Sequence, residues 1–391
     1  AAREMGIDRV DIRRRNHITP DMLPHTTPGG VTYDSGDFPA VLEKALAEAD
    51  WAGFAERKVA SEARGLLRGI GIGQYLEVTG PPSKEMGGVR FEADGTVTII
   101  TGTLDYGQGH ATAFAQVLTA RLGVPFEAIR LLQGDSDELL AGGGTGGSKS
   151  MMASGKAIYE AAELVKEKGI KLAAHFLEAA EADVEFSIAE TGGQFAIVGT
   201  DRRIDVMDLA ARARAATDLP ADIPNDLSVA HVADGPPFSF PNGCHIAEVE
   251  VDPETGVTTV VRYTMVNDFG VVINPMLVAG QAHGGVAQGI GQALMEAVVY
   301  DDQGQPLTGS FMDYALPRAD IMPDMTISHL PSPAKTNPLG VKGCGEAGCA
   351  GAMPSVMNAL VDALRPYGVN HIDMPATPER VWDAIRGAEK R

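Results

Sequence analysis

The sequence has little cysteine. Three cysteines occur among 391 residues, Cys244, Cys344 and Cys349. None belongs to a CxxC pair or to a His/Cys spacing typical of metal ligands. We therefore expect no disulfide framework, no iron–sulfur site and no metal held directly by side chains of this chain.

Long apolar runs and an excess of positive charge are also absent. No run of 18 apolar residues occurs, and the first residues lack the apolar core of a signal peptide, so we expect a cytoplasmic protein without a membrane span. The formal net charge of -20 argues against nucleic acid or an anionic membrane as a partner. Any anionic ligand would have to be held locally, by backbone N–H groups in glycine loops and at helix N-termini.

Glycine is in excess. The 46 glycines make up about 12% of the chain, compared with roughly 7% in ordinary proteins. A length of 391 residues favours two domains, or one large fold with two lobes. Because the first residue is Ala, inside an amphipathic pattern, the chain is expected to be part of a longer gene product or a processed piece.

The periodicity of apolar residues divides the chain into three parts. Residues 1–70 read as a peripheral helical segment. Residues 71–240 read as a first lobe of strands and helices, with a hairpin turn at Asp94-Gly95. A Pro/Gly-rich loop, GPPFSFPNG, separates it from a second lobe over 241–391. The predicted fold class is α+β, with two lobes of mixed β-sheet flanked by helices that meet at a cleft.

Helix and hairpin limits are predicted from local signals. Two helices are expected to end at Gly123 and Gly169, and another to be capped by Asn274. A hairpin with a turn at 253–256 should open the second lobe.

The first glycine motif is DYGQGHAT, residues 105–112, between a predicted strand and a predicted helix. Such a turn gathers unpaired N–H groups, as phosphate sites require. Gln108 would add a side-chain amide, and Gly109, His110 and Thr112 would lie beside it. The alternative is that the glycines only make a tight turn.

The second motif is GGGTGGSKS, residues 142–150, again before a helix. Gly146, Gly147, Ser148, Lys149 and Ser150 offer donors suited to a pyrophosphate. A mobile surface loop is the alternative, because glycine loses the most backbone entropy on ordering. The motif does not match GxxxxGK[ST], so an ordinary P-loop is not indicated.

The third motif, NPMLVAGQAHGGVAQGIGQAL, places five glycines inside a predicted helix that begins after Asn274. Relative to alanine they would cost about 4 to 5 kcal/mol, so a compensating close contact is expected. Tight helix packing explains most of them. Gln281 is the candidate for a ligand contact.

The fourth motif, NPLGVKGCGEAG, carries one acid, Glu346, in a loop of small residues before a helix. Lys342, Gly343, Cys344 and Gly345 precede it. A carboxylate with no nearby opposite charge can have its pKa raised by desolvation, which suits a general base. The alternative is a capping or solvent-facing glutamate.

Together, in this order, DYGQGHAT, TGGSKS, NPMLVAGQAHGGVAQGIGQAL and NPLGVKGCGEAG, with TGSFMDYALPRAD between the last two, resemble the large subunit of the xanthine dehydrogenase and aldehyde oxidase family. The nearest resemblance is to the C-terminal half of carbon monoxide dehydrogenase-type large chains. It runs over essentially the whole chain. The resemblance implies a molybdopterin-dependent oxidoreductase that adds water-derived oxygen to a substrate carbon.

The resemblance also implies where the cofactor lies. A molybdenum–molybdopterin, in bacteria usually the cytosine dinucleotide, would lie along the candidate residues of the first three motifs and along residues 342–345. Glu346 matches the catalytic glutamate of the family, which acts as a base. Electrons would leave through iron–sulfur clusters and FAD on partner subunits, a small iron–sulfur subunit and a medium FAD subunit.

Departures from the family pattern accompany the resemblance. The GGGFGxK and AYR loops of the family's earlier half do not occur here, so the N-terminal half of the large subunit is expected as a partner. Lys149 stands where relatives commonly have Arg, and Cys344 where Val is usual. The substrate, whether carbon monoxide, an aldehyde or an N-heterocycle, stays open. The alternative function is a cofactor-free fragment or structural subunit that is inactive without the other half.

Overall fold

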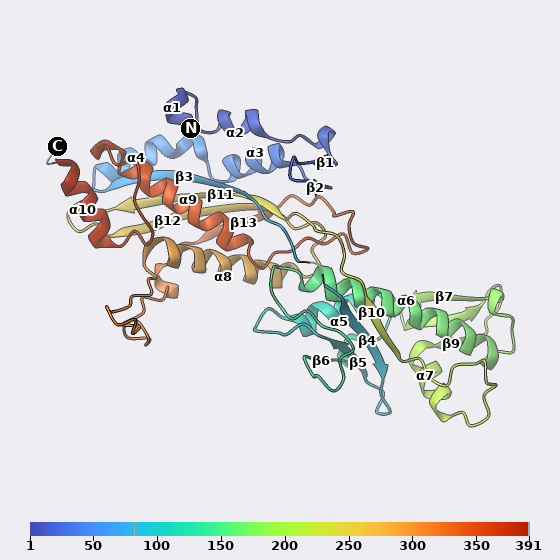
Figure 1. Cartoon of the computed structure of the whole chain (residues 1–391). Helices are drawn as coiled ribbons and strands as arrows, with labels where there is room; N and C mark the ends of the chain where they lie inside the picture. Colours follow the sequence, from blue (N-terminus) through green and yellow to red (C-terminus); the bar gives the residue numbers. More distant parts are fainter. Residues whose placement is uncertain (82, 390–391) are drawn as a thin grey trace.

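The computed structural model describes residues 1–81 and 83–389, which form two lobes (Figure 1). Each lobe contains a mixed β-sheet flanked by helices, so the predicted fold class is confirmed. Among the described residues, no helix is long and apolar enough to cross a membrane.

The second lobe is built on a four-stranded sheet in the order β13-β12-β11-β3. The strands β11 and β12 form the predicted hairpin, and β13 pairs with β12 in parallel. The expected boundary at residue 71 is wrong, because β3 pairs with β11 of the second lobe. The bounds are Leu67–Leu76 for β3, Asn242–Val251 for β11, Thr258–Asp268 for β12 and Met325–His329 for β13.

Alternate glycines of β3 allow a helix to lie directly on this sheet. Helix α9, Ala347–Ala363, covers the face to which Gly69, Gly71 and Gly73 belong. A Cβ atom at any of these positions would lie 2.1 to 2.4 Å from a carbonyl oxygen of α9. The intervening Ile70 and Ile72 pack on the opposite face of the sheet. Close backbone approach thus accounts for part of the glycine excess.

The residues before β3 cover that opposite face. Val10, Val41 and Leu42 pack against Ile70 and Ile72 in one buried cluster, so the segment expected to be peripheral also supplies core. Its helices are α1 (Ala2–Met5), α2 (Asp11–Asn16), α3 (Phe38–Glu48) and α4 (Phe54–Glu62), with a two-stranded ribbon of β1 (His25–Thr26) and β2 (Thr32–Tyr33).

Helix α8 (Pro275–Leu294) packs beside α9 in the same buried cluster as β11 and β12, and α10 (Pro378–Glu389) lies at the end of the lobe (Figure 1). Asn274 caps α8 as predicted, accepting the Leu277 N–H at 3.0 Å. Two of the five glycines of α8, Gly285 and Gly289, pack against the backbone of α9. The helix-packing interpretation therefore holds for these two.

The first lobe contains a four-stranded sheet in the order β10-β4-β5-β6. The predicted turn at Asp94-Gly95 joins β4 and β5. The helices α5 and α6 pack on this sheet, and a small sheet with α7 extends the lobe. The bounds are Glu85–Phe91 (β4), Val97–Thr101 (β5), His110–Leu122 (α5), Ile129–Gln133 (β6), Ser150–Phe176 (α6), Val184–Ala189 (β7), Gly192–Ile197 (β8), Arg203–Asp205 (β9), Val206–Ala215 (α7) and Val229–Ala233 (β10).

One predicted helix end is confirmed and one is wrong. Helix α5 ends at Leu122, followed by Gly123 in the left-handed conformation. Helix α6 continues through Gly169 to Phe176. A Cβ atom at Gly169 would lie 2.1 Å from the ring of Phe195, so this glycine serves packing against β8.

Candidate functional site

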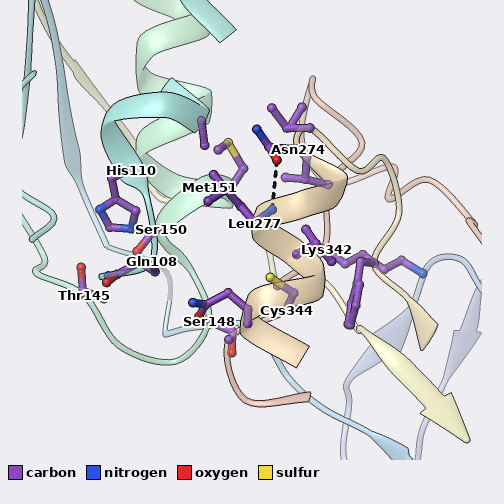
Figure 2. A pocket seen from close by; sticks show the side chains of 18 of the residues that line it. Gln108, His110, Thr145, Ser148, Ser150, Met151, Asn274, Leu277, Lys342 and Cys344 are labelled. Carbon is purple, nitrogen blue, oxygen red and sulfur yellow. Dashed lines mark hydrogen bonds between the residues drawn. The ribbon is translucent and has the colours of Figure 1, made fainter. Parts of the chain in front are cut away.

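A cavity of about 530 Å³ lies where the two lobes meet, and all four glycine motifs contribute to its wall. Figure 2 shows Gln108 and His110 across the space from α8, which carries Leu277. The candidate residues that line it are Gln108, His110, Gly146, Gly147, Ser148, Ser150, Gln281, Lys342, Gly343, Cys344, Gly345 and Glu346.

Three candidate residues do not line the cavity. Gly109 is the residue before α5 and adopts a positive φ of 80°. Thr112 lies within the first turn of α5. The side chain of Lys149 is buried, and its Nζ donates to the carbonyl of Gly143 at 3.2 Å. Lys149 therefore holds the glycine loop.

Several N–H groups of the first motif are already paired within the motif. The carboxylate of Asp105 accepts the N–H groups of Gly107, Gly109 and His110 at 2.8 to 3.2 Å. Burial alone would raise the pKa of Asp105, but these hydrogen bonds outweigh burial and lower the pKa. Asp105 therefore occupies the N–H groups of these three residues, which leaves fewer donors at this turn for a ligand than expected.

The amide of Gln108 is also engaged by its own loop. Its Oε1 accepts the Tyr106 N–H at 2.5 Å, and its Nε2 donates to the carbonyl of Leu104 at 3.0 Å. Gln108 lines the cavity, but a ligand would have to compete with these two hydrogen bonds.

Two other helices begin at the cavity without a capping side chain. Helix α6 starts at Ser150 and α9 at Ala347, and neither has a side-chain cap. The N–H groups of a first helical turn lack partners within the helix and carry partial positive charge. The cavity therefore has donors for an anion at the starts of α6 and α9.

The second motif is closely packed, which argues against a mobile loop. Gly147 has a φ of 61°, and a Cβ atom there would lie 1.8 Å from the carbonyl oxygen of Gly80. The Gly80 N–H donates to the Gly147 carbonyl at 2.9 Å. On the other side, Gly343 of the fourth motif packs against Ser148. Glycine at 147 and 343 thus lets three loops meet at the wall of the cavity.

Lys342 points away from the cavity (Figure 2). Its Nζ forms an ion pair with Asp268 at 2.6 Å and also donates to the carbonyl of Ser35 at 3.2 Å. Both side chains of the ion pair are fully buried. Lys342 can therefore approach a ligand only through its backbone.

Glu346, the candidate base, is exposed at the end of the loop before α9. The expected desolvation of its carboxylate is therefore wrong in this structure. The hydroxyl of Ser148 lies 2.6 Å from Glu346 Oε2, and the Glu346 N–H donates to the same hydroxyl at 3.0 Å. Ser148 has a φ of 55°, a backbone conformation that non-glycine residues adopt at local cost.

Sequence reasoning missed a second carboxyl group beside Glu346. Glu77 follows β3, and its Oε1 lies 2.9 Å from the Ser148 hydroxyl. Burial, reinforced by the Glu346 carboxyl, raises the pKa of Glu77 to about 8. Nothing in the string YLEVTG distinguishes Glu77 from any other glutamate after a strand.

Cys344 faces the cavity as a neutral thiol. Burial raises the pKa of its thiol to about 11, and the nearby Glu77 adds to the effect. Among residues 1–81 and 83–389, no group of three or more His, Cys, Asp or Glu side chains is arranged to hold a metal ion.

The remaining candidate, Gln281, lies on α8 and lines the cavity. A Cβ atom added at Gly280 or Gly284, which lie near Gln281 on the helix, would have no packing neighbour within 4 Å. Packing therefore does not explain these two glycines.

Known proteins resemble the chain over its whole length. A family model described as a molybdopterin cofactor-binding domain matches residues 44–323. The carbon monoxide dehydrogenase large chain of Hydrogenophaga pseudoflava is 35% identical, covering 98% of this chain and 49% of its own. The nicotine 6-hydroxylase large subunit of Paenarthrobacter nicotinovorans is 36% identical, covering 99% and 48%.

A solved structure resembles the fold equally well. Quinoline 2-oxidoreductase from Pseudomonas putida 86 superposes with a TM-score of 0.89 at 33% identity, over 98% of this chain and 50% of that chain. This chain thus spans about half the length of the curated relatives it matches.

Proposed function

Since the chain belongs to the molybdopterin cofactor-binding domain family, we propose that it forms the cofactor-binding, base-carrying half of a molybdenum hydroxylase large subunit. The family inferred from the four glycine motifs is thereby confirmed. A bound molybdenum cofactor would supply the redox centre for transfer of water-derived oxygen to a substrate carbon. The proposal concerns the whole protein, of which this chain spans about half.

The geometry of the cavity fits an anionic, organically bound cofactor. The uncapped starts of α6 and α9 offer N–H groups to phosphate, and Gly147 and Gly343 allow the loops of the cavity wall to pack closely against one another. These donors act locally, as the net charge of -20 requires. We propose that Ser150, Gln281 and the backbone of 342–345 line the cofactor, in its cytosine dinucleotide form.

The observation that carries the proposal is Glu346 at the wall of this cavity, held by Ser148 from the opposite loop. A carboxylate held by the Ser148 hydroxyl, which also accepts the Glu346 N–H, is positioned to accept a proton from a hydroxyl in the cavity. Glu346 is accordingly the proposed general base.

The proposed partners complete the site and remove electrons. The other half of the large subunit would close the cavity, and iron–sulfur and FAD subunits would accept electrons. A segment after α8, orange in Figure 1, projects from the lobe and leaves Phe311 and Met312 more than 90% exposed. Apolar side chains this exposed are typical of interaction surfaces. We further propose a cytoplasmic location.

The substrate class of the proposal is a small molecule with an oxidisable carbon. The relatives named for carbon monoxide and for nicotine are 35% and 36% identical to this chain, so identity favours neither substrate.

Substitution of Glu346 in the assembled enzyme tests the function. Glu346→Gln keeps the shape but cannot accept a proton, so turnover should fall by about 10² to 10⁴-fold while molybdenum and pterin contents stay unchanged. Glu56→Gln, on the exposed face of α4, is the matched control and should retain full turnover. Near-normal turnover of Glu346→Gln would contradict the base assignment. An assembled wild-type enzyme with no cofactor would favour a structural subunit.

A further inference from the structure

Ser148 lies between two carboxyl groups, and its single hydrogen cannot serve both. The Ser148 oxygen lies 2.9 Å from Glu77 Oε1 and 2.6 Å from Glu346 Oε2, and it accepts the Glu346 N–H at 3.0 Å. A hydroxyl donates one hydrogen bond and accepts two. Once Ser148 donates to one carboxylate and accepts the N–H, the other carboxyl can reach its remaining lone pair only by donating a proton.

We propose that Glu77 is a positioning residue for Glu346, that the two carboxyl groups share one proton, and that this proton stays on Glu77. Glu77 then donates to Ser148, which donates to an ionised Glu346. The inference rests on the proposed role of Glu346 as the base. It assigns Glu77 a task in that site that requires no contact with substrate or cofactor.

The environments of the two carboxyl groups place the proton. Glu346 is exposed, whereas Glu77 is partly buried and its Oε2 is buried without a hydrogen-bond partner. Burial favours the neutral form of a carboxyl group, and a neighbouring carboxylate adds to this. The raised pKa of Glu77, about 8, agrees with this placement.

The other charged groups around Glu77 leave this assignment unchanged. Tyr75 on β3 and Cys344 before α9 both have pKa values raised by burial and stay neutral near pH 7. Lys149, next to Ser148 in sequence, donates to Gly143, and Lys342 is paired with Asp268. Within the described part of the chain, no basic side chain forms an ion pair with Glu77.

The orientation of Glu346 depends on whether Glu77 keeps its proton. Ser148, held at a positive φ, is fixed by Glu77 on one side and by Glu346 on the other. When Glu77 loses its proton, two carboxylates compete for one hydroxyl hydrogen and repel each other. The orientation of Glu346 should then be lost, so the site should fail as pH rises through about 8.

Infrared spectroscopy of the full 391-residue chain, labelled with ¹³C-glutamate, tests the shared proton without any cofactor. The wild type should show a protonated-carboxyl band near neutral pH that disappears around pH 8. Glu77→Gln should abolish this band, and the control Glu56→Gln should leave it intact. Glu346→Gln should move its midpoint to lower pH, because the neighbouring negative charge is removed. Absence of a glutamate titrating above its ordinary range would overturn the proposal.

Turnover of the assembled enzyme tests the positioning role. Glu77→Gln donates to Ser148 as the protonated carboxyl does, so it should keep neutral-pH turnover and extend activity above pH 8. Glu77→Leu lacks the donor and should lower kcat by about tenfold with unchanged cofactor content. Equal behaviour of the two variants would overturn the positioning role. An inactive or cofactor-free wild-type assembly would instead contradict the proposed function and leave the infrared result standing.

Discussion

Lys342 and Asp268 form an ion pair that is fully withdrawn from solvent, with 2.6 Å between Nζ and Oδ2. Asp268 ends β12, and its carboxylate also accepts the N–H groups of Gly270 and Ser332. The pair therefore ties the loop that carries the candidate base to the sheet of the second lobe.

Removal of the lysine charge should destabilise the fold. Lys342→Met would leave the Asp268 carboxylate buried without its cation, which typically reduces the free energy of unfolding by about 3 to 5 kcal/mol. Urea unfolding of the full chain measures this. Lys44→Met, which removes a half-exposed lysine 3.8 Å from Glu48, is the control and should change stability by less than about 1 kcal/mol. Equal effects of the two variants would contradict a structural role for Lys342.

Gly147→Val should reduce the cofactor content of the assembled enzyme. A side chain at this position meets the Gly80 carbonyl at 1.8 Å and must adopt a positive φ that β-branched residues avoid. The loop would shift and displace Ser148 from the cavity. Molybdenum and pterin analysis measures the outcome, with Gly387→Ala on α10, where an added Cβ meets no other atom within 4 Å, as the control. Unchanged occupancy in Gly147→Val would show that the loop is only a linker.

Local features of the fold could be predicted because their signals lie within a few residues. The Asp94-Gly95 hairpin and the Asn274 cap both depend on neighbours along the chain. The sheet to which β3 belongs could not be predicted, because its partner β11 is far away in sequence. The continuation of α6 through Gly169 depends in the same way on the distant ring of Phe195.

In the candidate site, too, some features could be predicted from the sequence and others could not. The four motifs were predicted to share a cleft, and the structure brings all four to one cavity. Asp105 offered a readable signal, because an aspartate before a glycine turn at a helix start is a common cap. Glu77 had no such signal, since its importance arises only where Ser148 brings it to Glu346. Tertiary contact, not composition, makes this glutamate distinctive.

The stability of the chain should fall as pH rises through the pKa of Glu77. The folded pKa of about 8 lies above the ordinary value of 4.5, so the folded state holds this proton more tightly than the unfolded state. The contribution is fully present below about pH 4.5 and is lost as pH rises toward 8. Thermal unfolding at several pH values measures it against Glu77→Gln, in which this slope should disappear. Parallel pH profiles for the two proteins would contradict the raised pKa.

The chain by itself should fold yet retain no tightly bound molybdenum. Folding is expected because both lobes have buried apolar clusters of their own. Tight retention is not expected, because Gly146, Gly345 and Glu346 at the wall of the cavity are exposed, so water competes there for hydrogen bonds to a phosphate.

The net charge of -20 further opposes an anionic ligand on an open surface. A chain that supplies the other half of the relatives' length should close the cavity, lower its local dielectric and restore about one molybdenum per assembly. Inductively coupled plasma mass spectrometry after gel filtration measures the molybdenum content of the chain alone and of the assembly. Stoichiometric molybdenum in the 391-residue chain alone would contradict this prediction and show that this half holds the cofactor unaided.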